Sequence, residues 1–291
     1  MVRVFRVGPP RQAPSDINPK VAICTRGRRE QPVQWFFNLP DWVFGILSAS
    51  SAIAIGVGGL LATRKCIARL HATTSYNEIV SYYLSTVAIF YGIMLGLIAV
   101  SVWEGYNGAE TAVALEAGSL AALYRDVSGY PEPDRSAMQA SLREYTRYEI
   151  EVAWPEHRNG IITPGGMRRL WLFQDKLQAF EPRTKGQEVL HFETLRAYDD
   201  LIQKRSLRLD SITAHLPRPL WDFVILGAVL SFVVSWFFQL KSFTMHVWMT
   251  AFFAALLGME IHLMVIMNHP YRGSISVSPE AFQVVYDMLM R

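Results

Sequence analysis

Four long stretches of the chain are almost free of charged side chains. Residues 42–62, 79–103 and 223–240 contain no Asp, Glu, Lys or Arg, and residues 242–267 contain only Glu260. A helix of about 20 apolar residues spans the roughly 30 Å hydrocarbon layer of a membrane. A single helix also satisfies all its backbone hydrogen bonds within itself, which a single strand in lipid does not. The sequence therefore predicts an all-α, polytopic membrane protein with four transmembrane helices.

The charged residues, 18% of the chain, must lie outside these stretches. The long polar segment between the two pairs shows helical spacing and no strand-like alternation, so we expect a cytoplasmic helical bundle there. Five prolines before residue 33 and the lack of an apolar core indicate a mobile amino-terminal tail. The predicted division is a tail (1–40), transmembrane helices 1 and 2 (41–103), a cytoplasmic helical domain (104–217), transmembrane helices 3 and 4 (218–267), and a turn with a cytoplasmic tail (268–291).

Basic side chains near the ends of the stretches predict the orientation. With the amino terminus inside, the inner set is Arg26, Arg28, Arg29, Lys204, Arg205, Arg208, Arg218 and Arg272. The outer set is Arg64, Lys65, Arg69 and Lys241. Cytoplasmic flanks carry the excess of Lys and Arg, so eight against four places both termini and the middle domain in the cytoplasm, with the chain in the cell (inner) membrane.

Composition also excludes several classes of function. The net charge is only +3, and no basic run extends beyond residues 26–29, which argues against nucleic acid as a partner. Cys24 and Cys66 fall on opposite sides of the first stretch, so neither a disulfide framework nor a thiol metal site is expected. Phosphate-loop, nucleophile-elbow and dinucleotide motifs are absent from the sequence, and no cofactor is predicted.

The second stretch does not end at the membrane surface. Past Trp103, helix-forming residues continue without a proline until Pro131, which predicts one long helix that runs into the cytoplasm. Further expected features are a helix starting at 131–134, a loop over 157–166, helices around 170–180 and 189–212, and re-entry to the membrane at 215–217.

Small residues on one face of the second stretch suggest close packing against neighbouring helices of an oligomer. Gly92 and Gly96 form a small-xxx-small pair. On the opposite side, bulky side chains could form a hydrophobic constriction that gates a pore by dewetting. The candidate pore and gate residues, called here the constriction face, are Phe90, Met94, Leu97 and Ser101. The alternative is that this face contacts lipid.

Glu260 is the one charged residue deep in a stretch. A carboxylate in lipid costs several kcal/mol, so it should be protonated, paired or exposed to water. His262 follows two residues later, without the spacing of helical metal ligands, and no metal site is predicted. The acidic residues of the middle segment are interpreted as a solvated surface; they include Glu110, Glu116, Asp126, Glu132 and Asp134.

Several short motifs together resemble the bestrophin-like proteins over roughly residues 40–282. They are Ala114-Leu115-Glu116-Ala117, Leu123-Tyr124-Arg125-Asp126, Pro131-Glu132-Pro133, Tyr145 followed by Glu151-Val152-Ala153-Trp154-Pro155, Asn268-His269-Pro270-Tyr271-Arg272-Gly273 and Ser276-Val277-Ser278-Pro279. That family is similar to true bestrophins, homopentameric channels that mostly conduct anions and whose second span lines the pore.

The resemblance implies four spans, a cytoplasmic helical middle and a turn after the last span. The turn residues would be Asn268, Pro270, Tyr271, Arg272 and Gly273. The acidic calcium-binding run that follows this turn in bestrophins is replaced by residues 274–279, so a calcium clasp is not carried over. A structural corner is the preferred interpretation of the turn, because Pro and Gly dictate the chain path.

Two functions remain open at the level of sequence. The first is an oligomeric ion channel, expected to be a pentamer and anion-permeable, with membrane lipids and small ions as its other partners. The second is a membrane-anchored scaffold or signalling protein whose cytoplasmic helices bind a partner without ion conduction. An intramembrane enzyme that uses Glu260 is a distant third, and the chain is expected not to be an enzyme.

Overall fold

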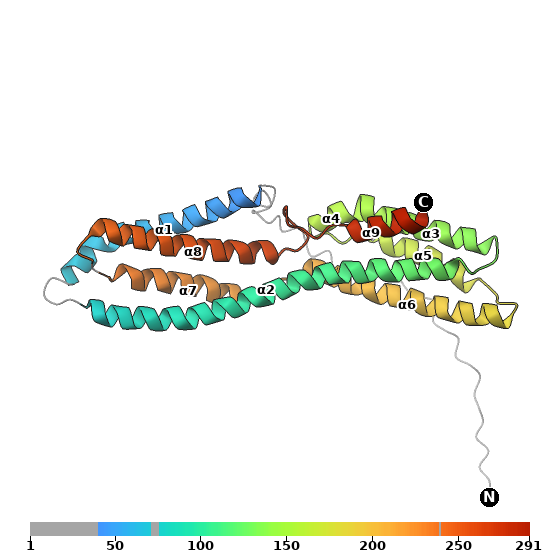
Figure 1. Ribbon diagram of the computed structural model, residues 1–291, viewed down its shortest axis with the longest axis horizontal. Helices are drawn as coiled ribbons and strands as arrows, with labels where there is room; N and C mark the ends of the chain where they lie inside the picture. Colours follow the sequence, from blue (N-terminus) through green and yellow to red (C-terminus); the bar gives the residue numbers. More distant parts are fainter. Residues whose placement is uncertain (1–39, 71–75, 239) are drawn as a thin grey trace, which may run out of the picture. The chain divides into compact units, whose positions relative to one another are not determined.

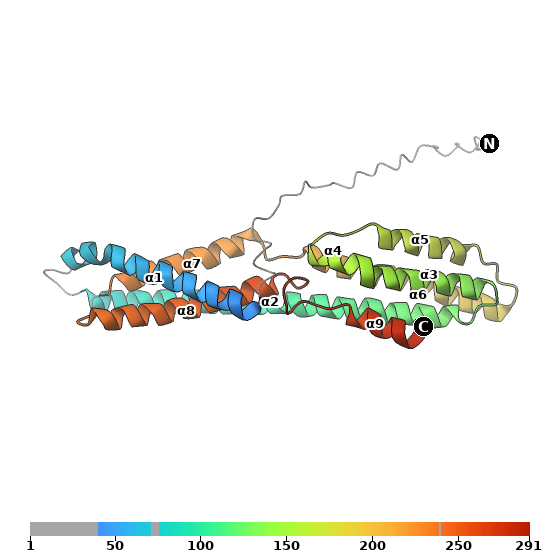
Figure 2. The same ribbon diagram turned by 90° about the horizontal axis from the view of Figure 1, so that it is seen from above.

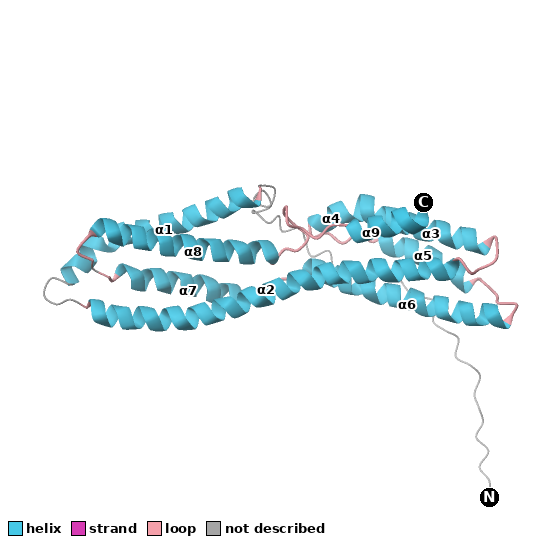
Figure 3. Cartoon of the chain, viewed as in Figure 1, coloured by secondary structure: helices cyan, strands magenta, loops and turns pink. Residues whose placement is uncertain are grey.

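The structure is a computed structural model that describes residues 40–70, 76–238 and 240–291. These residues form helices and connecting turns, with no strand among them (Figure 3). The all-α prediction is therefore confirmed. The predicted amino-terminal tail lies outside the described residues apart from Pro40.

Four segments are long and apolar enough to cross a membrane, as predicted. They contain α1 (Asp41–Leu70), α2 (Asn77–Val127), α7 (Arg218–Trp236) and α8 (Phe243–Met267). Two boundaries differ from the expected ones: α1 continues about two turns past residue 62, and α7 ends four residues before residue 240. The turn after α7 leads to Ser242, whose hydroxyl accepts a hydrogen bond from the Met245 amide and so caps α8.

The membrane helices pack through small residues. The α8 helix contacts α1, α2 and α7 (Figures 1 and 2). At Gly258, an added Cβ would lie 2.9 Å from the Ser48 carbonyl oxygen, so only glycine permits this approach of α8 to α1. The Ser48 hydroxyl donates a hydrogen bond of 2.8 Å to the Gly258 carbonyl across the same contact. Close packing of this kind is what holds helices together in lipid, where burial of apolar surface gives no advantage.

The described helices form two groups, the membrane helices and a second group made of the remaining helices. The longest helix, α2, belongs to both groups (Figure 1). Its first part contacts α7 and α8, and its second part contacts α3 (Asp134–Tyr148), α6 (Lys185–Thr213) and α9 (Glu280–Val285). The prediction of one continuous helix past Trp103 is confirmed. The second group surrounds an apolar core whose fully buried members include Leu120, Leu123, Met138, Leu142, Leu170, Phe173, Leu201 and Phe282.

The predicted helix after Pro131 is present, and it runs further than expected. The α3 helix continues through a π-helical turn (Glu149–Ala153) into α4 (Trp154–Arg158). Pro155 at the start of α4 has no amide hydrogen to donate, which suits a break in the regular ladder. The expected loop over 157–166 is therefore shorter, because α5 (Gly165–Gln178) follows soon after.

Candidate functional site

One side of α2 is buried within the protomer. Tyr91, Leu95, Ile98 and Val102 recur at helical spacing and pack with α7 and α8 residues in a second apolar cluster. The Tyr91 hydroxyl donates a hydrogen bond of 2.9 Å to the Val224 carbonyl. These contacts fix the rotation of α2 about its own axis relative to α7 and α8. They also determine which residues of α2 remain uncovered by other helices of the chain.

The constriction face lies on the uncovered part of α2. Phe90 is 69% exposed and Leu97 61% exposed, and Met94 and Ser101 are also exposed. At about 100° per residue, the direction furthest from the buried side is occupied by Ile89, Ile93 and Val100, named here the outward face; Ile93 is 60% exposed. The constriction face is thus one flank of a wide uncovered apolar surface.

The two glycines of the small-xxx-small pair lie on the other flank of the outward face. A Cβ added at Gly92 or Gly96 would meet no atom within 4 Å. The pair therefore has no partner among the described residues of its own chain, and its role in packing between subunits stays a prediction.

Glu260 and His262 face different helices. His262 packs edge-on against the Phe44 ring, with the two ring centroids 4.7 Å apart, and it lies next to Gly45. It therefore contacts α1. Glu260 is half-buried and lies near enough to Tyr91 of α2 to interact with it electrostatically. No ion pair joins Glu260 to another described residue.

The residues of the turn after α8 are anchored by α6, by the α6–α7 connection and by the segment that follows α4. The Asn268 side-chain oxygen accepts a hydrogen bond of 2.7 Å from the Leu216 amide. Tyr271 is buried and its hydroxyl is 2.9 Å from that of Ser211. Arg272 donates to the Asn159 carbonyl at 2.8 Å. Such contacts are those of a structural corner.

Two further turn residues set the chain path. The Pro270 carbonyl accepts a hydrogen bond of 2.8 Å from the Val277 amide. Gly273 has φ +82°, a left-handed conformation that favours glycine. Next to it, the Ser274 hydroxyl contacts the Asp41 carboxylate at the start of α1. The turn therefore lies beside the amino-terminal end of the first membrane helix.

A cavity of about 200 Å³ lies between the turn and α2. Ser101 of the constriction face, His215 and Asn268 are among the residues that line it. Ser101 and Asn268 were predicted separately, as a pore residue and a turn residue, and the fold brings them to the same cavity. Its lining contains no acidic or basic side chain apart from the imidazole of His215.

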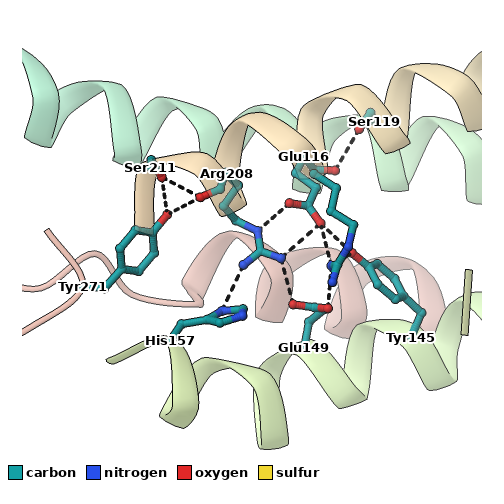
Figure 4. A network of polar contacts seen from close by, with 9 residues as sticks. Glu116, Ser119, Tyr145, Glu149, His157, Arg208, Ser211 and Tyr271 are labelled. Carbon is teal, nitrogen blue, oxygen red and sulfur yellow. Dashed lines mark hydrogen bonds and ion pairs between the residues drawn. The ribbon is translucent and has the colours of Figure 1, made fainter. Parts of the chain in front are cut away.

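The interpretation of Glu116 as a solvated surface residue is wrong. Glu116 is 0% exposed, and its carboxylate oxygens lie 2.5 Å from Arg208 Nε and 3.4 Å from Arg208 Nη2 (Figure 4). Arg208 is also fully buried, and its Nη2 donates to Glu149 at 2.8 Å. Arg205 Nη1 donates to Glu149 and to the Tyr145 hydroxyl, each at 2.6 Å. We call Glu116, Glu149, Arg205 and Arg208 the charge cluster.

The charge cluster joins three helical segments. Glu116 comes from α2, Glu149 from the π-helical turn, and the two arginines from α6. Its two negative and two positive charges balance, which suits a buried position. Burial works against charge on Arg208, but Glu116 and Glu149 outweigh it and raise its pKa. Burial and the neighbouring carboxylates raise the pKa of Tyr145 well above its ordinary value.

Spacing along α6 contained a signal for the cluster. The buried positions of α6 are Thr194, Tyr198, Leu201, Arg205, Arg208 and Ile212. They alternate steps of three and four, so the two arginines occupy core positions of one helical stripe. A charge on such a stripe predicts a buried partner of opposite charge.

His157 caps one side of the cluster. Its Nδ1 lies 3.1 Å from Arg208 Nη1, and because a guanidinium only donates, Nδ1 must accept and Nε2 must carry the hydrogen. Nε2 is buried without a hydrogen-bond partner among the described residues. Burial and the nearby Arg208 and Arg205 lower the pKa of His157 to about 3, so the ring is neutral at physiological pH. Within the described residues, no group of three His, Cys, Asp or Glu side chains could hold a metal ion.

Comparison with known families agrees with this architecture. The family model of the Bestrophin-like domain matches residues 50–282. The chain belongs to the Bestrophin-like family. No match was found among curated proteins.

Solved structures support the same fold. Two crystal structures of a bacterial bestrophin homologue from Klebsiella pneumoniae, each a single-substitution variant, match this Bestrophin-like chain with TM-scores of 0.62 and 0.61. Both are 12% identical in sequence, and each match covers 85% of this chain and 99% of the other. At this identity the likeness shows the fold alone.

Proposed function

We propose that this Bestrophin-like protein is an oligomeric ion channel, expected to be a pentamer, in which α2 lines the path. The observation that carries the proposal is the uncovered apolar side of α2. Over the length of the membrane, α2 packs one side against α7 and α8 and leaves the constriction and outward faces free. A ring of such helices would enclose a path with apolar walls, which can gate by dewetting.

The family supports this proposal, because the bestrophins that the chain resembles are pentameric channels with the pore on their second span. Those channels mostly favour anions, and anion permeation is what the resemblance implies here. In this chain the sign of the permeant charge depends on the side chains that α2 presents to the axis.

The contacts of the turn support the proposed topology. Ser274 contacts Asp41 at the start of α1, and Asn268 contacts Leu216 before α7. These contacts support a topology in which the start of α1, the start of α7 and the end of α8 share one side of the membrane with the helical middle domain. Together with the excess of Lys and Arg, this favours a cytoplasmic middle domain and cytoplasmic termini in the cell membrane.

Ion flux tests the proposal. We expect liposomes containing the purified full-length protein to release small ions, and Phe90→Ala or Leu97→Ala to raise the leak, because a smaller side chain widens an apolar constriction and eases its wetting. The measurement is efflux followed by ion-selective electrodes. Phe252→Ala is a matched control, since Phe252 of α8 is 70% exposed but lies on another helix; its leak should equal that of the wild type.

Two results would argue against parts of the proposal. Absence of flux for every small ion tested would count against a channel, and equal leak from the Phe90 and Phe252 variants would remove the constriction face from the path.

The cytoplasmic helices offer an observation in favour of the scaffold as second candidate. Trp171 of α5 and Phe192 of α6 are exposed large apolar residues. Such side chains are enriched in protein interfaces. A partner bound through them, with no flux and with no ring-shaped assembly, would favour the scaffold over the channel.

A further inference from the structure

We infer that Glu104 makes the path along α2 favour cations over anions. The inference rests on the proposed channel and assigns the sign of its permeant ion. It departs from the anion preference that the resemblance to bestrophins implies, and it comes from the position of one carboxylate on α2.

Glu104 lies on the uncovered side of α2, directly after the predicted membrane stretch of residues 79–103. Its side chain is exposed in the protomer. It makes no ion pair with any described residue of its own chain. Within the described part of the protomer, its charge is therefore not neutralised by an ion pair.

Glu104 would face the proposed path whether the constriction face or the outward face of α2 lines it. At about 100° per residue, Glu104 lies roughly 50° from the centre of the constriction face. It lies roughly 40° from the centre of the outward face. A rotation of α2 that turns one of these faces to the axis thus also presents Glu104 to the water there.

The surrounding sequence of α2 does not offset this charge. Along α2, the residues after Glu104 include Glu110 and Glu116 and no Lys or Arg until Arg125, which is 21 residues further on. At about 1.5 Å per residue this is roughly 30 Å away, about three Debye lengths at 0.1 M salt. Gly108 and Gly118 on the same side carry no side chain and meet no atom within 4 Å of an added Cβ.

Several copies of α2 around one axis would bring their Glu104 carboxylates together at the cytoplasmic end of the membrane path. Such a ring raises the local concentration of cations and lowers that of anions. Rings of Asp or Glu side chains are a known basis of cation selectivity in channels. Glu104 is thus the residue of this chain that would determine the sign of the permeant charge.

The test is the reversal potential of the full-length protein in planar bilayers under a sodium chloride gradient, at low ionic strength where screening is weak. We expect the wild type to favour sodium over chloride. Glu104→Gln should lower the sodium-to-chloride permeability ratio about tenfold, which corresponds to ~1.4 kcal/mol. Glu104→Lys should reverse the preference.

Glu110→Gln is the matched control, because it removes the same charge from an exposed residue of the same helix. Glu110 lies six residues further on, roughly 120° around the helix from Glu104, so its substitution should leave the reversal potential unchanged. Ion current with the same reversal potential in the wild type and both Glu104 variants would overturn the role of Glu104 and leave the channel in place. An equal shift in Glu110→Gln would overturn it as well, by showing a general effect of net charge. Absence of current for both sodium and chloride would overturn the channel itself.

Discussion

The pairing of Glu116 with Arg208 determines how the helical middle domain responds to substitution. Glu116→Gln leaves the guanidinium groups of Arg205 and Arg208 facing one carboxylate, Glu149. Removing one partner of a buried ion pair costs about 3–5 kcal/mol. For a domain of this size that corresponds to a fall in Tm of about 10 °C, measurable by thermal unfolding of the detergent-solubilised protein.

Two further variants separate the cluster from general effects of charge. Glu110→Gln, at an exposed position, should change stability by less than about 0.5 kcal/mol. The double variant Glu116→Gln with Arg208→Gln restores the charge balance, so it should lose less stability than the sum of its two single variants. Additive losses would contradict direct coupling of Glu116 and Arg208.

The neutral ring of His157 makes stability depend on pH. Burial and the nearby arginines hold its pKa at about 3, below the ordinary value of 6.5. The unfolded chain therefore binds more protons than the folded chain between these values, so this contribution to stability is complete above pH 6.5 and falls as the pH drops toward 3. His157→Gln keeps an acceptor for Arg208 but does not titrate.

The expected result is that Tm falls more between pH 7 and pH 5 in the wild type than in His157→Gln, as measured by thermal unfolding at each pH. Parallel curves for the two proteins would show that His157 does not titrate in this range on unfolding.

At the scale of the helices, the sequence predicted those features that depend on residues close together in the chain. Charge-free stretches predicted four membrane helices, and the missing proline between Trp103 and Pro131 predicted the length of α2. The π-helical turn after α3 and the early end of α7 were not predicted. Glu149 of the π-helical turn pairs with Arg205 and Arg208 of α6, and helical periodicity does not report such contacts between segments far apart in the chain.

The candidate site also has one part that depends on a local pattern and one part that depends on contacts between distant segments. The uncovered side of α2 follows from one periodic pattern, whereas the charge cluster needs residues 116, 149, 205 and 208 to meet from three segments. The acidic residues were assigned to the surface by the ordinary rule that charges stay exposed. That rule fails for Glu116 because its carboxylate forms a buried ion pair with Arg208.

For the whole molecule, the deciding measurement is the number of copies. The uncovered faces of α2, with Gly92 and Gly96 open on one flank, predict a ring of subunits around a wet axis. We expect particle images of the detergent-solubilised protein to show five copies and an axial hole. A monomer or dimer with a filled centre would contradict both the ring and the path along α2.

The uninterrupted course of α2 has a mechanical consequence. At about 1.5 Å per residue, its 51 residues form one continuous helix of roughly 75 Å. The helix that presents the constriction and outward faces therefore also carries Glu116, the buried partner of Arg208. A stimulus that loosens this internal pairing would therefore act directly on the helix that is proposed to line the path, without a separate connecting segment.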